Sequence, residues 1–400
     1  MNSNLQQAIS AFKSGKFVIV TDDADRENEG DLFILGENLS EQDMGFMVRY
    51  TSGVICAAIT EEIANRLELP YMVKRNQDSK QTAFTVSVDA KSGLTTGISA
   101  AERANTLRVL SNVETLPTDL VRPGHIFPLV ANSGGLGARR GHTEAAVVMA
   151  VAVGAKPIVA LSEIVNEDGS MARGQQLIDF ASQHQIPMIT IAELAEEFGG
   201  IKFESQSPLR WAKLPRERSD WQIAIYRNPF GTEHAILKFG SPETKSDPLV
   251  RLHSECLTGD ALGSARCDCG SQLELAFAEI EAHGYGYILY LRDHEGRGIG
   301  LSAKIEAYIL QDAGFDTVDA NLKLGHQIDQ RDYQDAAEIL KKLGVAQITL
   351  LTNNPEKVAQ LKRHGLVVNR RALLGPLNST NEFYLKTKQT RLKHELGIEG

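Results

Sequence analysis

The 400-residue sequence is poor in cysteine: it has four, too few to form a disulfide scaffold in a chain of this length. It also lacks any run of about 18 apolar residues, the length that a membrane-spanning helix needs. The first residues, MNSNLQQAIS, have neither the basic start nor the apolar stretch of a secretory signal. We therefore expect a cytoplasmic protein without a membrane partner.

Positive charge is scarce as well, since 42 Lys and Arg residues face 51 Asp and Glu residues and the formal net charge is −9. Proteins that bind nucleic acid usually present a basic surface to the phosphates, so the composition argues against a nucleic-acid partner. Any phosphate chemistry must therefore depend on local groups of basic side chains.

The length and the apolar content predict two globular domains, because 42% hydrophobic residues can bury a full core and 400 residues exceed one ordinary domain. In the first half, strand-like runs alternate with segments of helical length and composition. The runs are FVIVTD (17–22), GVICAAIT (53–60), FTVSV (84–88), HIFPLV (125–130) and PIVAL (157–161), and the helical segments are 99–111 and 143–153. Residues 174–199 have the pattern of a helix, a short strand and a last helix.

The composition changes at 199–220, where Gly, Pro, Ser and mixed charges occur without a sustained period. A second α/β unit follows, with strand-like WQIAIY, LVRLH, YGYILYLR, AQITLLT and LVVNR. Leu273, Ala276, Phe277 and Ile280 repeat at helical spacing within 270–282. The sequence thus predicts a mixed α/β or α+β protein with two globular domains, residues 1–205 and 206–400.

The densest charged stretch of the first domain is DDADRENEGD (22–31), directly after a predicted strand. By itself such a run is most simply a solvated acidic turn. Its place at a strand end, where loops carry functional sites, and Gly30 among the carboxylates favour a site instead.

A second cluster, ANSGGLGARRGHTEA (131–145), combines glycines with Arg139 and Arg140 and leads into a helical segment. Main-chain N–H groups beside glycines and the forked guanidinium of arginine suit a phosphate, although a glycine-rich surface loop is an equal alternative. His142 and Glu27 together could hold Mg²⁺ or Mn²⁺. Glu163, after the strand PIVAL, is a further candidate carboxylate.

Three of the four cysteines lie in RLHSECLTGDALGSARCDCG (251–270), as Cys256, Cys267 and Cys269. Three thiolates leave one zinc position open for water, as a hydrolytic site requires, whereas a fourth ligand such as His253 would make the site structural. The Gly/Arg loop HEGRGIGL (294–301), between a strand and a helix, suits phosphates and favours a metal hydrolase acting on a phosphorylated compound. Cys56, the fourth cysteine, is most simply a buried small hydrophobic residue.

Five ordered motifs, DRENEGD, TTGISAAER, RPGHIFPL, RRGHTEA and SEIVNEDGSMAR, make residues 5–200 resemble 3,4-dihydroxy-2-butanone 4-phosphate synthase. That family converts ribulose 5-phosphate into the butanone phosphate and formate with Mg²⁺ or Mn²⁺. The resemblance implies Glu27 and His142 as metal ligands, and Glu163 and His142 as catalytic groups. Ribulose 5-phosphate would contact Arg26, Glu27, Asp31, Arg139, Arg140, Gly141, Thr143 and Glu163.

Residues 215–375 resemble GTP cyclohydrolase II through RLHSECLTGD, GSARCDCGSQLE, YLRDHEGRGIGLSAKIEAY, DTVDAN, DQRDY and LLTNNPEK. That family opens the guanine ring of GTP and releases formate and pyrophosphate. The resemblance implies Zn²⁺ on Cys256, Cys267 and Cys269, with an activated water that attacks the base. GTP would contact Arg251, Leu252, His253, Ser254, Glu255, Gln272, Glu295, Gly296, Arg297, Tyr308, Thr317, Thr352 and Lys357.

Two further residues have roles implied by this resemblance: Asp329 as a proton acceptor and Arg331 as a nucleophile on the α-phosphorus. An arginine almost always stays protonated, so Arg331 could instead stabilise charge on the leaving pyrophosphate. We predict a bifunctional enzyme of riboflavin biosynthesis, expected from both families to be a homodimer. The alternative is that only the first activity remains and that the C-terminal half is a zinc-stabilised nucleotide-binding or assembly module.

Overall fold

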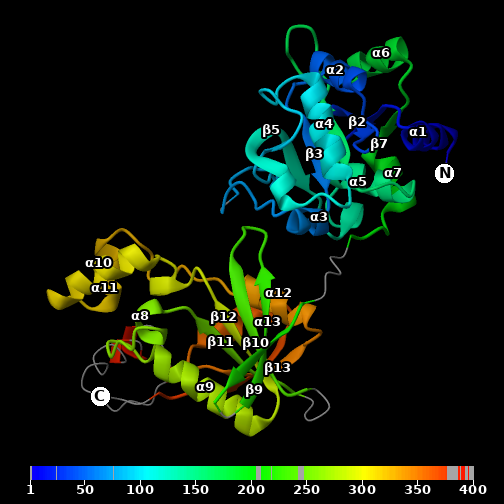
Figure 1. The fold of residues 1–400 in the computed structure, drawn as a ribbon. Coiled ribbons are helices and arrows are strands. Elements are labelled where there is room, and N and C mark those ends of the chain that lie inside the picture. Colours follow the sequence, from blue (N-terminus) through cyan, green and yellow to red (C-terminus); the bar gives the residue numbers. More distant parts are fainter. Residues whose placement is uncertain are drawn as a thin grey trace. The chain divides into compact units, whose positions relative to one another are not determined.

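The computed structural model describes residues 2–23, 25–74, 76–203, 209–217, 219–241, 247–375, 386–387, 389–391 and 395. The chain divides into two compact units, Met1–Ser207 with Pro229–Gly231, and Pro208–Asn228 with Thr232–Gly400 (Figure 1). The predicted boundary between residues 205 and 206 falls in 204–208, outside the described residues. Within the described ranges, every helix is too short or too polar to span a bilayer.

The N-terminal unit is built on a seven-stranded mixed sheet in the order β4-β5-β3-β6-β2-β1-β7. Its strands are β1 (Val18–Thr21), β2 (Gly30–Leu35), β3 (Cys56–Ile59), β4 (Val88–Ala90), β5 (Leu120–Val130), β6 (Val159–Glu163) and β7 (Met188–Thr190). β2 lies antiparallel between β1 and β6, so the ends of these three strands bring residues 21–31 and 163 to one edge of the sheet.

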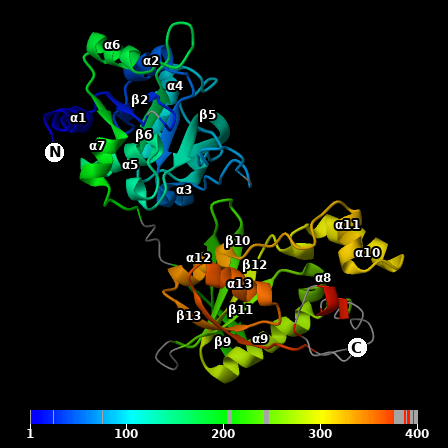
Figure 2. The same ribbon diagram turned by 180° about the vertical axis from the view of Figure 1, so that it is seen from behind.

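Helices cover both faces of this sheet (Figures 1 and 2). They are α1 (Ser3–Lys13), α2 (Glu41–Tyr50), α3 (Glu61–Arg66), α4 (Ala100–Ser111), α5 (His142–Ala152), α6 (Gln175–His184) and α7 (Ile191–Phe198), with 3-10 turns at Pro117–Asp119 and Gly135–Gly137. Side chains of α1, α5 and α7 pack on one face, and those of α2, α3 and α4 on the other. α5 is buried along most of its length, because it is apolar on all sides.

The C-terminal unit has a second seven-stranded sheet, in the order β14-β13-β11-β12-β10-β9-β8. The strands are β8 (Ala212–Arg216), β9 (Ser219–Arg227), β10 (Glu233–Phe239), β11 (Leu249–Ser254), β12 (Gly286–Leu291), β13 (Gln347–Leu351) and β14 (Val367–Arg371). β12, β11, β13 and β14 are parallel, and the others form an antiparallel meander. The carboxyl ends of β11, β12 and β13 therefore share one edge, where α/β proteins commonly bind ligands.

The helices of this unit are α8 (Leu257–Asp260), α9 (Cys269–His283), α10 (Leu301–Asp312), α11 (Thr317–Lys323), α12 (Gln334–Lys342) and α13 (Pro355–Arg363), with a 3-10 turn at Glu295–Arg297. α9 packs on one face of the sheet, and α12 and α13 pack on the other. α10 and α11 lie next to each other beside the sheet rather than on either face (Figures 1 and 2).

The mixed α/β architecture predicted from the sequence is confirmed, and most predicted strands and helices are present. Of the strand predicted at 84–88, only Val88 lies in a paired strand, β4, while Phe84 and Thr85 form isolated bridges. The backbone N–H of Val86 donates to the carbonyl of Pro70, and that of Thr85 donates to the carbonyl of Pro128. This segment therefore divides its backbone hydrogen bonds between two neighbouring segments instead of pairing with a single strand.

Candidate active sites

The acidic stretch of the N-terminal unit is the turn between β1 and β2, and Asp22 organises it. The Asp22 carboxylate accepts hydrogen bonds from the backbone N–H of Glu29 at 2.9 Å and of Glu27 at 3.0 Å. It also accepts one from the Arg26 guanidinium at 3.0 Å, and Arg26 in turn lies 2.7 Å from the Glu27 carboxylate. These bonds hold Glu27 at the edge of the sheet.

His142, the first residue of α5, reaches into this turn. Its Nδ1 lies 3.5 Å from Oε2 of Glu27, and its Nε2 lies 3.8 Å from Oδ1 of Asp31. Ligand atoms of Asp22, Glu27 and His142 all lie within 4.8 Å of one another. Two carboxylates and an imidazole are the donor set that suits a hard divalent ion with water and substrate oxygens, so these residues fit Mg²⁺ or Mn²⁺.

The proton equilibria of the cluster are strongly coupled. Burial raises the pKa of Asp31 to about 7, against the opposing charge of His142. Burial would lower the pKa of His142, but Asp31, Glu27 and Asp22 raise it to about 9. The hydrogen bond from His142 lowers the pKa of Glu27. A carboxyl group with a pKa near 7 beside a second carboxyl group whose pKa is lowered is typical of acid–base sites.

The other predicted groups of this unit surround the cluster or the start of α5. Glu163 is the β6 partner of Asp31 in the strand register, and its Oε2 accepts a hydrogen bond from Ser52 at 2.8 Å. Arg139 pairs with Glu144 at 2.6 Å across Gly141, where a Cβ atom would meet Arg139 Nη1 at 2.2 Å. Thr143 is buried at the first turn of α5, and Arg140 is exposed.

In the C-terminal unit the three predicted cysteines converge, with their sulfur atoms within 4.8 Å of one another. The Sγ atoms of Cys256 and Cys267 are 3.7 Å apart, close to the roughly 3.8 Å that tetrahedral coordination with Zn–S bonds of about 2.3 Å imposes. Gly259 makes room for them, because a Cβ there would meet Cys267 Sγ at 2.7 Å. The cluster therefore fits zinc.

His253, the possible fourth ligand, is directed elsewhere. Its Nε2 lies 3.0 Å from the Asp260 carboxylate, which also accepts the backbone N–H of Cys256 at 2.9 Å and the hydroxyl of Tyr290 at 2.9 Å. Among the described residues, the metal-ligand group at this place contains the three cysteines alone. That arrangement favours an open coordination position over a closed structural site.

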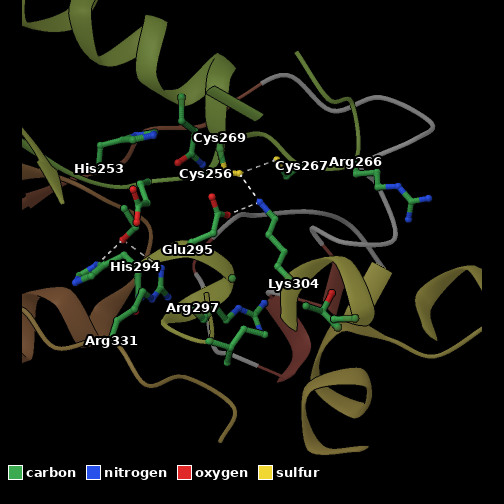
Figure 3. Close-up of a pocket in the computed structure, with 18 of the residues that line it drawn as sticks. His253, Cys256, Arg266, Cys267, Cys269, His294, Glu295, Arg297, Lys304 and Arg331 are labelled. Atoms are coloured by element: carbon green, nitrogen blue, oxygen red, sulfur yellow. Dashed lines mark hydrogen bonds and ion pairs between the residues drawn. The ribbon is translucent and has the colours of Figure 1, made fainter. Parts of the chain in front are cut away.

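A pocket at the carboxyl edge of the parallel strands contains these sulfur atoms (Figure 3). Its lining includes twelve of the thirteen residues predicted to contact GTP, together with Arg331. Those twelve are Arg251, His253, Ser254, Glu255, Gln272, Glu295, Gly296, Arg297, Tyr308, Thr317, Thr352 and Lys357. Leu252 is different, because its side chain belongs to the core, while its carbonyl accepts a hydrogen bond from the Lys357 ammonium at 2.7 Å.

Arg297 is the strongest indication that this pocket binds an anion. It is only 8% exposed, and within the described part of the chain neither Nη1 nor Nη2 has a hydrogen-bond partner. Its backbone lies in the left-handed region with φ of 70°, which is rare for a residue other than glycine. A buried guanidinium with open donors is costly unless a ligand satisfies it, and phosphate does so in a two-pronged manner.

Arg331 lines the pocket and forms an ion pair with Asp329, which is not among the lining residues. Arg331 Nε donates to Oδ1 of Asp329 at 2.8 Å, and Nη2 donates to Oδ2 at 2.5 Å. Burial would raise the pKa of Asp329, but Arg331 lowers it below the usual value. Asp329 is thus ionised at neutral pH, and its two oxygens accept charge-assisted hydrogen bonds from the guanidinium.

Comparison with known proteins assigns a family to each half of the chain. The 3,4-dihydroxy-2-butanone 4-phosphate synthase family model matches residues 6–197, and the GTP cyclohydrolase II model matches residues 209–372. The riboflavin biosynthesis protein RibBA of Salinispora tropica is 48% identical over 98% of this chain and 98% of its own. The chain belongs to the RibBA family. It is a bifunctional enzyme of riboflavin biosynthesis, with a synthase domain followed by a cyclohydrolase domain.

Two more relatives of this RibBA-family chain cover it in whole or in part. A chloroplastic bifunctional riboflavin biosynthesis protein of Arabidopsis thaliana is 45% identical over 99% of this chain and 74% of its own. A crystal structure of 3,4-dihydroxy-2-butanone 4-phosphate synthase in complex with two magnesium ions is 42% identical, with a TM-score of 0.47, and covers 49% of this chain and 99% of that one.

Asp22, His294 and Lys304 are among the residues of the two candidate sites that were not predicted from the sequence. Asp22 joins Glu27 and His142 in the synthase domain, but it is one of several carboxylates in a short run and no sequence signal separates it from the others. His294 and Lys304 line the cyclohydrolase pocket. His294 stands beside Glu295 in HEGRGIGL, whereas Lys304 in a helical segment has the pattern of an ordinary surface lysine.

Proposed function

We propose that the two residue clusters are the two active sites of the enzyme. The cluster of Glu27, Asp31, Glu163 and His142 would convert ribulose 5-phosphate into 3,4-dihydroxy-2-butanone 4-phosphate and formate. The pocket with the three cysteines would hydrolyse GTP to the diaminopyrimidine product, formate and pyrophosphate. The observation that carries the second assignment is that one pocket contains three thiols and the Arg297 guanidinium, whose Nη1 and Nη2 atoms have no hydrogen-bond partner among the described residues.

In the synthase domain, Asp22, Glu27 and His142 would hold Mg²⁺ or Mn²⁺. When bound, the ion would stabilise the enediolate that forms when a proton leaves the carbon beside the carbonyl. Asp31 and Glu163 face each other on neighbouring strands and are the carboxylates best placed to take and return that proton. Arg139, Gly141 and Thr143 lie at the start of α5, where the helix N-terminus and the guanidinium would attract the substrate phosphate together with Arg140 and Arg26.

In the cyclohydrolase domain, Cys256, Cys267 and Cys269 would hold Zn²⁺, which when bound lowers the pKa of water at its open position. Arg297 and Lys357 would bind the phosphates, and Tyr308 would lie at the base. Asp329 would accept a proton. The charged, bidentate pair that Arg331 makes with Asp329 supports an electrostatic role for Arg331 on the leaving pyrophosphate rather than a nucleophilic one.

The experiment that tests this assignment uses full-length protein with one mutation in each cluster. His142→Ala should abolish butanone phosphate formation and leave formate release from GTP near wild type, since the groups belong to separate units. Cys267→Ser should do the reverse, because a hydroxyl is a poor substitute for a zinc thiolate. GTP turnover by Cys267→Ser at the wild-type rate, or equal loss of both activities in either variant, would contradict the assignment.

The association state and the cellular location stay predictions. We infer a homodimer from the resemblance to the two families, and the cytoplasmic location stays an expectation from the sequence. Sedimentation equilibrium of the full chain would give twice the 43.8 kDa monomer mass if this is correct.

A further inference from the structure

Lys304, on α10, is a buried lysine at the centre of the cyclohydrolase pocket, with 7% of its surface exposed. Its Nζ lies 2.5 Å from Oε1 of Glu295 and 3.2 Å from Sγ of Cys256 (Figure 3). It also lies 2.9 Å from Oγ1 of Thr258. An ammonium has three N–H donors and no acceptor. All three donors are therefore used within the protein, which leaves Lys304 none for a substrate.

Each of the three acceptors belongs to a different part of the site. Cys256 is one of the proposed zinc ligands. Glu295 lies in the loop after β12, and its second oxygen accepts the backbone N–H of Leu257 at 2.7 Å. The Thr258 hydroxyl also lies 3.1 Å from the hydroxyl of Tyr308, the residue expected beside the reacting ring. The Lys304 ammonium thus links the three cysteines, the Gly/Arg loop at 294–301 and, through Thr258, the side chain of Tyr308.

We propose that Lys304 is a positioning residue of the GTP cyclohydrolase reaction. Its ammonium fixes the positions of Cys256, Glu295 and Tyr308 relative to one another, and it reduces the electron density that the Cys256 sulfur donates to a bound zinc ion. The proposal rests on the zinc assignment made above. Three thiolates carry more negative charge than one zinc ion neutralises, and an N–H···S hydrogen bond from a cation withdraws part of it. A zinc ion held by these cysteines would then keep its ability to polarise water. Without the ammonium, the site would also be one charge more negative toward the triphosphate.

A purely structural lysine would behave differently. It would fill space and stabilise the fold, and its loss would change neither the electronic properties of a bound metal nor the turnover of the folded protein. The test therefore needs a spectroscopic readout of Cys256. Co²⁺ in place of zinc provides it, because thiolate-to-cobalt charge transfer absorbs in the near ultraviolet and responds to hydrogen bonding at sulfur.

The experiment compares full-length wild type, Lys304→Met and Lys304→Arg, with Lys342→Met as the matched control on the exposed surface of α12. Lys304→Met should lower kcat for GTP by about 10- to 100-fold, the usual effect of removing a hydrogen-bond partner of a metal ligand. Its cobalt charge-transfer band should move to longer wavelength. Lys304→Arg keeps the charge and should recover part of the turnover and of the band position. Lys342→Met and the butanone phosphate activity of every variant should match wild type.

The possible results distinguish a failure of the proposal for Lys304 from a failure of the zinc assignment on which it rests. If the wild type with cobalt gives no thiolate band and releases no formate from GTP, the zinc assignment fails. If the wild type does both and folded Lys304→Met keeps the wild-type band, the positioning role is overturned, whatever its turnover. If Lys304→Met fails to fold, the test uses Thr258→Val, which leaves the ammonium in place. The proposal then predicts that GTP turnover is reduced while the cobalt band is nearly unchanged. Unchanged GTP turnover in this variant contradicts the proposal.

Discussion

The Nε2 atom of His142 lies 3.8 Å from Oδ1 of Asp31, and among the residues that the structure describes neither atom has a hydrogen-bond partner. Both side chains are buried. Their pKa values are both raised, to about 7 for Asp31 and about 9 for His142. The metal-free folded protein therefore holds protons that the unfolded chain would release.

This relationship fixes the sign of a pH effect on stability. A group with a raised folded-state pKa contributes stability that is fully present below its unfolded pKa and is lost as the pH rises through the folded value. For His142 the window runs from its ordinary 6.5 to about 9, and for Asp31 from 3.8 to about 7. The metal-free synthase domain should thus lose stability as the pH rises from 6.5 to 9. Calorimetry in the presence of a chelator measures this. Asp31→Asn should flatten the slope, because it removes the titration of Asp31 itself and the charge that most raises the pKa of His142. An equally steep slope in that variant contradicts the prediction.

Asp22 should prove necessary for metal affinity. Its carboxylate holds the turn by accepting hydrogen bonds from the N–H groups of Glu27 and Glu29, and it is itself part of the ligand group. Asp22→Asn should weaken Mg²⁺ binding by about 10- to 100-fold, as measured by titrating butanone phosphate formation with Mg²⁺. Asp23→Asn, next in the chain and exposed, is the matched control. If both variants need the same Mg²⁺ concentration as wild type, Asp22 is not part of the site.

Helices and strands with a clear local pattern of apolar residues could be predicted from the sequence. A buried strand without such a pattern could not. The periodic apolar residues of 270–282 gave α9 to within a residue or so at each end, and PIVAL led to β6. β2 was missed, because all six of its residues are buried and no alternation separates them from the acidic run before them. A continuous apolar run does not distinguish a central strand from other buried structure.

The residues of the candidate active sites also differ in how well the sequence predicts them. Cysteine spacing at 256–269 identified the sulfur cluster, because few other patterns bring three thiols together. Lys304 had no signal, since a lysine in a helix usually points to solvent and only the fold places its ammonium against Cys256 and Glu295. Long-range pairing therefore decides which charged residues belong to the site.

Arg297 should be the main phosphate contact of the cyclohydrolase domain. Its two guanidinium nitrogens are buried without a partner in the described part of the chain, so a triphosphate would gain charge-assisted hydrogen bonds there. Arg297→Met should raise KM for GTP by about 10- to 100-fold, since hydrogen bonds to charged groups are worth roughly 1.5–3 kcal/mol. Arg297→Lys should recover only part of this, because a lysine lacks the fork. Arg363→Met, at an exposed arginine of α13, is the control, and equal KM values for all four proteins would exclude a phosphate contact.

Gly259 should be required for zinc, although it supplies no ligand atom. A Cβ at this position would lie 2.7 Å from Cys267 Sγ, closer than real Cβ contacts allow, and at the tight distances of 3.0 Å from Cys269 Cβ and 3.1 Å from Cys256 Sγ. The sulfur atoms cannot move apart without leaving tetrahedral geometry, so Gly259→Ala should lower the zinc content and GTP turnover together, by at least about tenfold. Gly375→Ala is the matched control, because a Cβ there meets nothing nearer than 3.5 Å. Butanone phosphate formation should be unchanged in both variants. Full zinc content in Gly259→Ala would mean that the α8 backbone yields instead, and the close approach would then not be what holds the cluster.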